Sequence, residues 1–349
     1  MIVKNLKARK ILNSAGNWTI ECNLIAETGR QTKASAPAGI STGKFEKKLS
    51  PINQALHQIH KEILPKIQNI NLTQEGLDKI LQSNNWGSNA TLVTSAAFFK
   101  LGLFESTLDK AEMPQLMMII FEGEKHGNPN LTIQEFMVVV NKIENGVSFY
   151  QKVEQHLRRE KIITTVGSEG GFSPANFTDQ KILDLLKKLG AKRIALDIAG
   201  NVNPPSVNSL LDITQRYPIV SVEDPFPEGK LKQWQEFFKG AVKINPDILI
   251  VADDLTVTDA QKIEEGAKRK LFNAVIIKPN QQGTISAAVK AMKTAQKLAI
   301  KTIVSHRGEE TNDNWIVDLA LKYKADFVKF GAPCRGERVA KYNRLLQLT

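Results

Sequence analysis

The sequence predicts an α/β protein in which a closed barrel of eight strands, a (β/α)8 barrel, follows a small α+β cap domain. Three observations lead to this prediction. Apolar, β-branched runs alternate with helical segments between residues 194 and 332, two more apolar runs precede this repeat, and the first third of the chain has a different pattern. A chain of 349 residues has room for both parts. We place the cap domain at residues 1–112 and the barrel domain at residues 113–349.

The first third reads as a strand meander followed by helices. We expect strands over residues 3–12, 19–27 and 31–36, and helices over 50–67, 73–83 and 89–106. The loop between them, PAGISTGKFE at residues 37–46, is rich in small residues. It is not a phosphate-binding loop of the GxxxxGK[ST] type, because only three residues separate Gly39 from Gly43. These residues alone fit a simple connector as well as a mobile active-site lid.

The barrel prediction starts from five apolar runs that each end in an ionisable residue. These residues recur at intervals of about 25 to 30 positions, which is enough for a strand, a loop, a helix and a return; they are Asp197, Glu223, Asp253, Lys278 and His306. A sixth run covers 326–332 at the same interval. Runs at 115–121 and 135–140 bring the number of strands to eight, as a closed small barrel requires.

The residues that end these runs should meet, because chemistry in such barrels gathers at the C-terminal ends of the strands. A single Asp after a strand is often only the cap of the next helix. That explanation fails for Glu223, since Glu is a poor cap, and for Lys278, since a helix N-terminus favours anions. Carboxylates at one barrel mouth repel each other unless a divalent cation neutralises them, and an all-oxygen set suits Mg²⁺. The sequence therefore predicts a Mg²⁺ site with a lysine beside it.

The overall charge favours an anionic partner. There are 47 Lys and Arg residues against 36 Asp and Glu, which gives a formal charge of +11. A phosphorylated metabolite is favoured over nucleic acid, because the basic clusters fall on separate helical segments without interleaved aromatic residues. The two cysteines form no CxxC pair, the N-terminus has no cleavage signature, and no window is apolar enough to span a bilayer. We therefore expect a cytoplasmic protein with no membrane partner.

Motifs along nearly the whole chain resemble those of enolase, the phosphopyruvate hydratase of glycolysis. The matching stretches, in order, are ARKILNSAGNWTIE, PAGISTGKFE, HGNPNLTIQEFM, VGSEGGFSPANF, SVEDPF, VADDLTVTDAQKI, IIKPNQQG, VSHRGEETND and GAPCRGERVAKYNRLL. The resemblance implies an α+β cap on a barrel of ββαα(βα)6 order, in which one strand runs antiparallel. It also implies a lyase that dehydrates 2-phosphoglycerate to phosphoenolpyruvate with two Mg²⁺ ions.

The resemblance also assigns roles to individual residues. It implies that Lys278 is the general base, that Glu169 is the general acid, and that Lys341 is a second lysine at the substrate carboxylate. The implied metal ligands are Asp197, Glu223 and Asp253, with Ser41 of the lid at the second Mg²⁺. The other substrate-binding and proton-relay positions fall on His126, Gln134, Glu135, His306 and Arg307.

The chain departs from the family pattern at a few positions near these residues. Ser168 stands where an acid normally precedes the catalytic glutamate, Gly308 replaces a serine after the phosphate-binding arginine, and Ala38 replaces a lid serine. The usual C-terminal tail is missing, and with it an arginine that pairs across the dimer with the position of Glu21, so a homodimer is an open expectation. Two alternatives remain open: a paralogue with an altered phosphorylated hydroxy-acid substrate, and a non-catalytic scaffold or nucleic-acid-binding protein on this fold.

Overall fold

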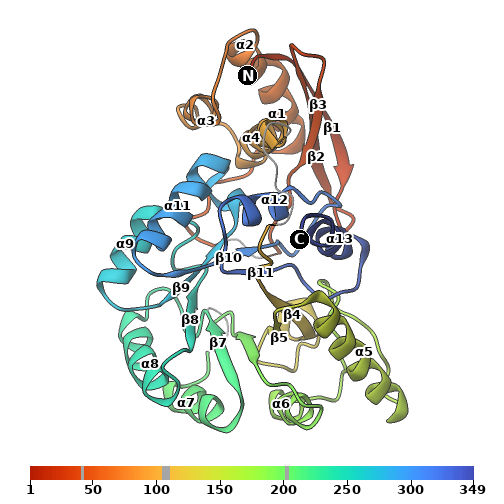
Figure 1. The fold of residues 1–349 in the computed structure, drawn as a ribbon, viewed down its shortest axis with the longest axis vertical. Coiled ribbons are helices and arrows are strands. Elements are labelled where there is room, and N and C mark those ends of the chain that lie inside the picture. Colours follow the sequence, from red (N-terminus) through yellow and green to blue (C-terminus); the bar gives the residue numbers. More distant parts are fainter. Residues whose placement is uncertain (41–42, 104–110, 201–203) are drawn as a thin grey trace.

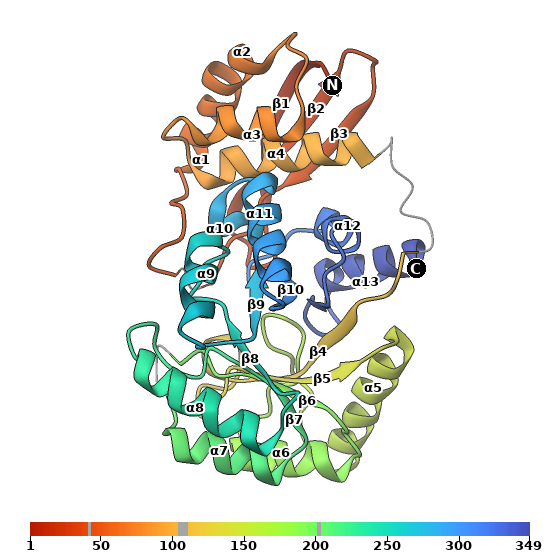
Figure 2. The same ribbon diagram turned by 60° about the vertical axis from the view of Figure 1, so that its left-hand side comes forward.

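The computed structural model describes residues 1–40, 43–103, 111–200 and 204–349. It has two parts, an N-terminal layer of one sheet and several helices above a closed barrel (Figures 1 and 2). This arrangement confirms the predicted fold class. The boundary at residue 112 stays a prediction. Within the described part of the chain, every helix is too short or too polar to cross a membrane.

The N-terminal sheet is the expected antiparallel meander. It consists of β1 (Val3–Leu12), β2 (Trp18–Ala26) and β3 (Gln31–Ser35), paired in that order. The helical pattern at 50–67 forms α1 (Ile52–His57), a π-helical stretch (Gln58–Ile63) and α2 (Leu64–Ile67). Next come α3 (Gln74–Gln82) and α4 (Ser88–Leu103). Helix α4 is buried along nearly its whole length, because it packs on β2 and β3 and also on barrel helices.

The barrel closes in the order β10-β11-β4-β5-β6-β7-β8-β9. The strand bounds are β4 (Gln115–Glu122), β5 (Glu135–Val140), β6 (Ile194–Asp197), β7 (Ile219–Glu223), β8 (Leu249–Ala252), β9 (Ala274–Ile277), β10 (Lys301–Ser305) and β11 (Phe327–Lys329). Strand β5 is antiparallel to both β4 and β6, whereas the other neighbouring pairs are parallel. The implied ββαα(βα)6 order is therefore confirmed.

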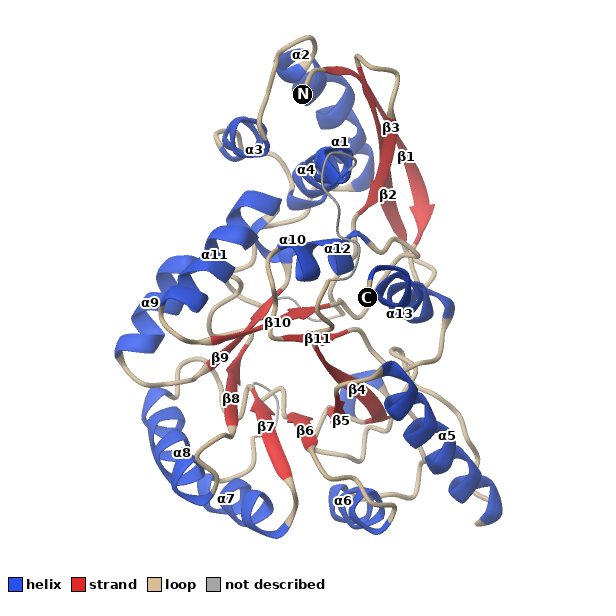
Figure 3. Ribbon diagram, in the orientation of Figure 1, coloured by secondary structure: helices blue, strands red, loops and turns tan. Residues whose placement is uncertain are grey.

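Helices surround the barrel strands on the outside (Figure 3). They are α5 (Ile143–Arg159), α6 (Asp179–Lys188), α7 (Val207–Arg216), α8 (Leu231–Ile244), α9 (Ala260–Lys268), α10 (Pro279–Gln282), α11 (Ile285–Lys297), α12 (Trp315–Lys322) and α13 (Gly336–Leu348). The side chains of Thr178, Ser206 and Asp259 accept a backbone N–H at the starts of α6, α7 and α9. Because these helices cover the strands, the strands can be apolar on both faces.

Side chains of the cap domain complete the N-terminus of the barrel helix α11. Thr284 at the N-cap makes no side-chain capping bond. Instead, Asp78 Oδ2 on α3 accepts the Ser286 N–H at 2.8 Å, and Ser95 Oγ on α4 accepts the Ile285 N–H at 2.9 Å. Free N–H groups at a helix start need acceptors, and the dipole there favours a carboxylate. Side chains of the N-terminal domain thus cap a helix of the barrel domain, and these two hydrogen bonds link the domains.

We predict that Asp78→Ala lowers the free energy of unfolding by about 1–3 kcal/mol, the usual cost of leaving buried polar groups unpaired. Asp78 is fully buried, so water cannot replace its carboxylate. Chemical denaturation of the purified protein measures the change, and Glu236→Ala at an exposed position on α8 is the control. Equal midpoints for the two variants would show that this interdomain cap contributes nothing.

Candidate active site

One cavity lies at the C-terminal ends of the barrel strands. Every predicted site residue in the described part of the chain lines it except Lys341. Its lining comprises Gly39, Ile40, Glu46, His126, Gln134, Glu135, Glu169, Asp197, Ala199, Glu223, Asp224, Asp253, Asp254, Lys278, Ser305, His306, Arg307, Gly308 and Lys329. Ser41, predicted at the second Mg²⁺, lies outside the described residues. The cavity thus contains both acids and bases, drawn from segments far apart in the sequence.

The three predicted metal ligands come from three neighbouring strands. Asp197 ends β6, Glu223 ends β7, and Asp253 directly follows β8. Asp197 and Glu223 face each other in the parallel register, and all three side chains are buried. Burial raises the pKa of Glu223 well above its ordinary value, and the neighbouring Asp197 raises it further. The repulsion expected from the sequence is therefore present.

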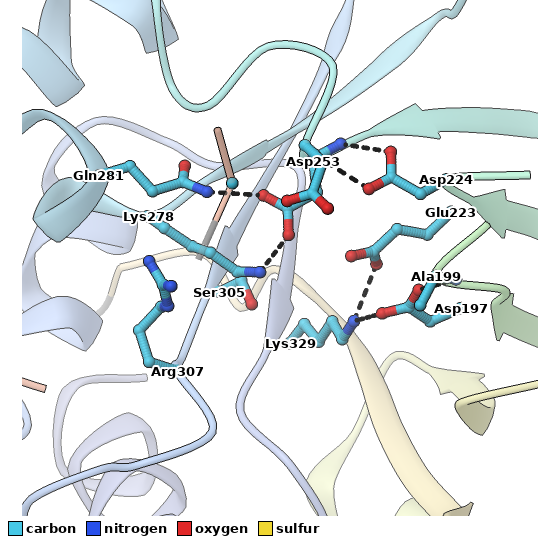
Figure 4. A network of polar contacts seen from close by, with 12 residues as sticks. Asp197, Ala199, Glu223, Asp224, Asp253, Lys278, Gln281, Ser305, Arg307 and Lys329 are labelled. Atoms are coloured by element: carbon cyan, nitrogen blue, oxygen red, sulfur yellow. Dashed lines mark hydrogen bonds and ion pairs between the residues drawn. The ribbon is translucent and has the colours of Figure 1, made fainter. Parts of the chain in front are cut away.

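Lys329, at the end of β11, lies among these acids (Figure 4). Its Nζ is 2.7 Å from Asp197 Oδ2, 2.9 Å from Glu223 Oε2 and 2.9 Å from Glu135 Oε2. Burial alone would lower the pKa of Lys329, but the three carboxylates raise it well above its usual value. Lys329 is therefore an ammonium that neutralises the strand ends.

The position of Lys329 corrects one prediction, because Lys341 does not lie in this cavity. Lys341 belongs to α13, and its buried Nζ lies 3.0 Å from Glu310 Oε2 and 3.0–3.3 Å from three backbone carbonyl oxygens. With four acceptors around it, this amine fixes a loop and cannot reach a ligand in the cavity. The sequence does carry a signal for Lys329, because this residue lies in the sixth apolar run, at 326–332. The run continues beyond Lys329, however, so Lys329 does not end it in the way that the other five ionisable residues end theirs.

Lys278 is paired with Asp253 (Figure 4), and Gln281 Nε2 donates to the other oxygen of Asp253 at 3.0 Å. Burial alone would lower the pKa of Lys278, but Asp253 raises it above its ordinary value. Arg307 acts in the opposite direction and lowers it. In this state Lys278 is therefore protonated, and its pKa can fall only when the contact with Asp253 is broken.

Glu169 lies between two histidines of different charge. His126 Nδ1 is 3.4 Å from Glu169 Oε1, and His306 Nε2 is 3.3 Å from Glu169 Oε2. Arg338 lies 2.5 Å from His306 Nδ1; because a guanidinium can only donate, the proton of neutral His306 must be on Nε2, facing Glu169. Burial, together with Arg338, lowers the pKa of His306 to about 4.

His126 carries the charge instead. Burial would lower its pKa, but Glu169 and then Glu135 raise it to about 9. Burial would likewise raise the pKa of Glu169, but the flanking histidines bring it well below its usual range. The positive charge beside Glu169 is that of His126, since His306 is neutral. The site therefore holds a His126 imidazolium against an ionised Glu169.

Arg307, after β10, already binds a carboxylate. Its Nη1 and Nη2 each lie 3.1 Å from one oxygen of Glu46, in the two-bond geometry that guanidinium groups make with carboxylates and phosphates. Sequence reasoning missed Glu46, which lies at the end of the 37–46 loop. Paired backbone bonds of 2.9 and 3.0 Å between Ala38 and Glu309 hold the start of this loop beside Arg307. The loop therefore lies at the cavity.

Comparison with known families agrees with the geometry. The family description "Enolase, C-terminal TIM barrel domain" matches residues 110–203 and 206–349, and "Enolase, N-terminal domain" matches residues 3–108. The chain belongs to the enolase family. It is 32% identical to the enolase of Elusimicrobium minutum (strain Pei191) over 406 aligned positions, covering 99% of this chain and 95% of the relative. It is 32% identical to that of Ehrlichia canis (strain Jake) over 405 positions, covering 99% and 96%.

Membership of the enolase family makes the chain an enolase-type lyase, and its donor set fits the family's Mg²⁺. The carboxylates that meet here are hard oxygen donors, and burial together with the neighbouring Asp197 raises the pKa of Glu223. Oxygens of Asp224, Asp253 and Asp254 also lie within 4.8 Å of one another. The Asp224 oxygens accept the backbone N–H groups of Asp253 and Asp254 at 3.0 and 2.9 Å. Asp224 therefore fixes the end of β8 that presents Asp253.

Gly308, one of the departures from the enolase pattern, lies against the side chain of Ile40. A Cβ atom added to Gly308 would lie 2.7 Å from Ile40 Cδ1 and Cγ1, and 3.4 Å from Glu169 Oε1. The Ile40 side chain therefore covers Gly308, next to the carboxylate of Glu169. An apolar side chain occupies the space into which a residue larger than glycine would project.

We predict that the two active-site histidines titrate far apart in the ligand-free protein. His126 should lose its proton near pH 9, and His306 should stay neutral down to about pH 4 with its proton on Nε2. Because the folded-state pKa of His126 is raised, its stabilising contribution is complete below the pKa of an unfolded imidazole and is lost as the pH rises through about 9.

Long-range ¹H–¹⁵N spectra of histidine-labelled protein measure both titrations, with signals assigned from His126→Gln and His306→Gln variants. Merged titrations near the ordinary imidazole pKa would contradict the charge assignment around Glu169.

Proposed function

We propose that the protein is a Mg²⁺-dependent lyase that interconverts 2-phosphoglycerate and phosphoenolpyruvate. The observation that carries this proposal is the convergence of three carboxylates, two lysines and a histidine-flanked glutamate in one buried cavity. A scaffold has no use for such a costly cluster of buried charges. A role in nucleic-acid binding is supported only by the formal charge of +11 and does not account for these buried groups.

Asp197, Glu223 and Asp253 are the residues that would hold the cation. When bound, Mg²⁺ would supply positive charge to the substrate carboxylate and to the extra negative charge that builds up when a proton leaves C2. Two ions, the second near Ser41, remain part of the proposal. Lys329 adds a fixed ammonium to the same region, and we assign to it the contact with the substrate carboxylate that the sequence had assigned to Lys341.

Lys278 is the proposed base at C2. It must first lose its contact with Asp253, because that contact keeps it protonated. Burial and the neighbouring Arg307 then both lower its pKa toward the working range. Release from Asp253 is therefore the event that makes Lys278 a base.

Glu169 is the proposed acid for the departing C3 hydroxyl group. It is ionised in the structure, so it must receive a proton before it can donate one. His126, protonated and 3.4 Å away, is the nearest source. Arg307 would bind the phosphate with the two-bond geometry that it now uses for Glu46, so the ligand must displace that carboxylate.

A related phosphorylated hydroxy acid is the second candidate substrate. The observation that favours it is the apolar side chain of Ile40, which covers Gly308 at the position where the enolase pattern has a serine hydroxyl.

The expected location and oligomeric state stay proposals. A cytoplasmic location agrees with two free thiols, Cys22 and Cys334. A homodimer cannot use Glu21 in the usual way if that side chain keeps its bond of 2.8 Å to Arg9 in the same chain.

We predict Mg²⁺-dependent formation of phosphoenolpyruvate from 2-phosphoglycerate, which is followed by its ultraviolet absorbance. Chelation should abolish turnover, and Lys278→Ala should lower kcat by roughly 10²–10⁴-fold, the usual contribution of a positioned acid or base. Lys290→Ala, on the exposed face of α11, is the matched control and should leave turnover unchanged. Folded protein that fails to turn over 2-phosphoglycerate with Mg²⁺ would reject this substrate and favour the altered one.

Mutation should distinguish the roles of the two buried lysines, Lys329 and Lys341. Lys329→Met should lower kcat by roughly 10²-fold or more, because it removes the ammonium that contacts Asp197, Glu223 and Glu135. Lys341→Met should act on stability, with a loss of about 3–5 kcal/mol from an unpaired buried Glu310.

The readouts are kcat per folded molecule and the free energy of unfolding. A large kcat effect from Lys341→Met in the folded fraction, together with none from Lys329→Met, would restore the assignment made from the sequence.

A further inference from the structure

We propose that Glu122 is a positioning residue that holds the catalytic Glu169 in place, an inference that rests on the proposed function. Glu122 is the last residue of β4 and is fully buried. It was not among the residues expected from the sequence. The enolase resemblance would place an acid at position 168, directly before Glu169, and the chain has Ser168 instead. Glu122 supplies a carboxylate behind Glu169 from a different element.

The Glu122 carboxylate binds the backbone on both sides of the catalytic side chain. Oε1 and Oε2 lie 3.1 and 3.0 Å from the Glu169 nitrogen, and Oε1 accepts the Gly171 N–H at 2.5 Å. The Glu122 backbone N–H donates to the carbonyl oxygen of Phe172 at 3.0 Å. Successive backbone N–H groups that turn around an anion form a recognised type of anion-binding loop. Here the anion belongs to the protein itself.

Two glycines of the VGSEGG motif, Gly167 and Gly171, are explained by this carboxylate. A Cβ atom on Gly167 would lie 2.2 Å from Glu122 Oε2, and one on Gly171 would lie 3.1 Å from Oε1 and 2.7 Å from Ile119 Cγ2. Gly170 has φ +92°, a conformation that other residues rarely adopt. The backbone can wrap this closely around Glu122 only because these positions lack side chains.

The remaining neighbours make the loop rigid. Tyr150 Oη donates to the carbonyl oxygen of Gly170 at 2.7 Å, and the Tyr150 ring stacks on Phe172 with centroids 4.4 Å apart. With the backbone fixed on both sides, Glu169 has little freedom to leave its place between the two histidines. A displacement of about 1 Å at a catalytic group can cost roughly 10²-fold in rate.

Glu122 also changes the electrostatics of Glu169. Burial raises the pKa of Glu122 to about 7, with Glu169 adding to the rise and the two backbone N–H groups and His126 opposing it. The ionisable groups near Glu122 include Glu169, His126 and Tyr150, together with Glu135, which lies directly opposite it on β5. A negative charge at Glu122 disfavours the ionised form of Glu169 and also raises the pKa of His126, so it keeps the proton that these two groups exchange bound to a higher pH.

The test compares Glu122→Gln, which keeps the shape and removes the charge, with Glu122→Ala and with the control Glu112→Gln at an exposed position. We expect kcat for dehydration to fall about 10-fold in the Gln variant and about 100-fold in the Ala variant, with KM changed less than about threefold. The alkaline limb of the kcat profile should move to lower pH in both variants, because loss of a neighbouring negative charge lowers the pKa of His126 as well as that of Glu169.

A second measurement does not depend on turnover. Hydrogen exchange of the peptide spanning 166–172 should be slow in the native protein and in Glu112→Gln, and fast in Glu122→Ala. Unchanged exchange, or an unchanged kcat and pH profile in both Glu122 variants, overturns the proposal. Native protein that is inactive on 2-phosphoglycerate but shows the expected exchange pattern overturns the proposed function and supports the positioning of Glu169 by Glu122.

Discussion

The need to balance several buried carboxylates around one cavity is the constraint on which the rest of the site depends. Parallel strands bring their C-terminal ends together, so Asp197 and Glu223 are neighbours whatever their charges. Coulomb repulsion between such groups is strong where water is excluded. The structure balances it with Lys329, whose stem lies within the barrel and whose amine contacts both acids.

The second half of the cavity is balanced by a different device. Glu169 has a neutral histidine on one side and a protonated one on the other, and a second carboxylate, Glu122, behind it. A fixed ammonium would hold Glu169 ionised permanently, whereas an imidazolium can release its proton. Under the proposed function, the permanent charge of Lys329 thus lies where a charge would have to be held, and the transferable charge of His126 lies where a proton would have to move.

Much of this could be predicted from the sequence, because strand ends are local features. Asp197, Glu223, Asp253, Lys278 and His306 each follow an apolar run, and the structure brings all five to one cavity. The reversed direction of β5 could not be predicted from spacing, since an apolar run reads the same in either direction. Only the resemblance to enolases implied it.

The residues that were missed act through long-range contacts that no local pattern encodes. Glu46 meets Arg307 across 261 positions, and Glu122 meets the backbone of Glu169 across 47. The position of Lys341 outside the cavity could not be predicted for a related reason. Lys341 lies in a strongly matching motif, but its amine turns away from the cavity toward the carbonyl groups that end a loop. A motif locates a segment, whereas the direction of a side chain depends on which acceptors the fold places around it.

The pairing of Glu46 with Arg307 has a consequence for ligand choice. Both side chains are at least nine-tenths buried and joined by two bonds, so an anion that binds Arg307 must first displace a well-matched carboxylate. Free phosphate would gain little binding free energy, because its contact with Arg307 would only replace the contact that Glu46 already makes. Under the proposed function, a phosphorylated acid would gain in addition at Lys329 and at a cation held by the strand-end carboxylates, and these extra contacts would offset the displacement. The pairing of Arg307 with Glu46 would therefore favour ligands with two anionic groups at a fixed separation over those with one.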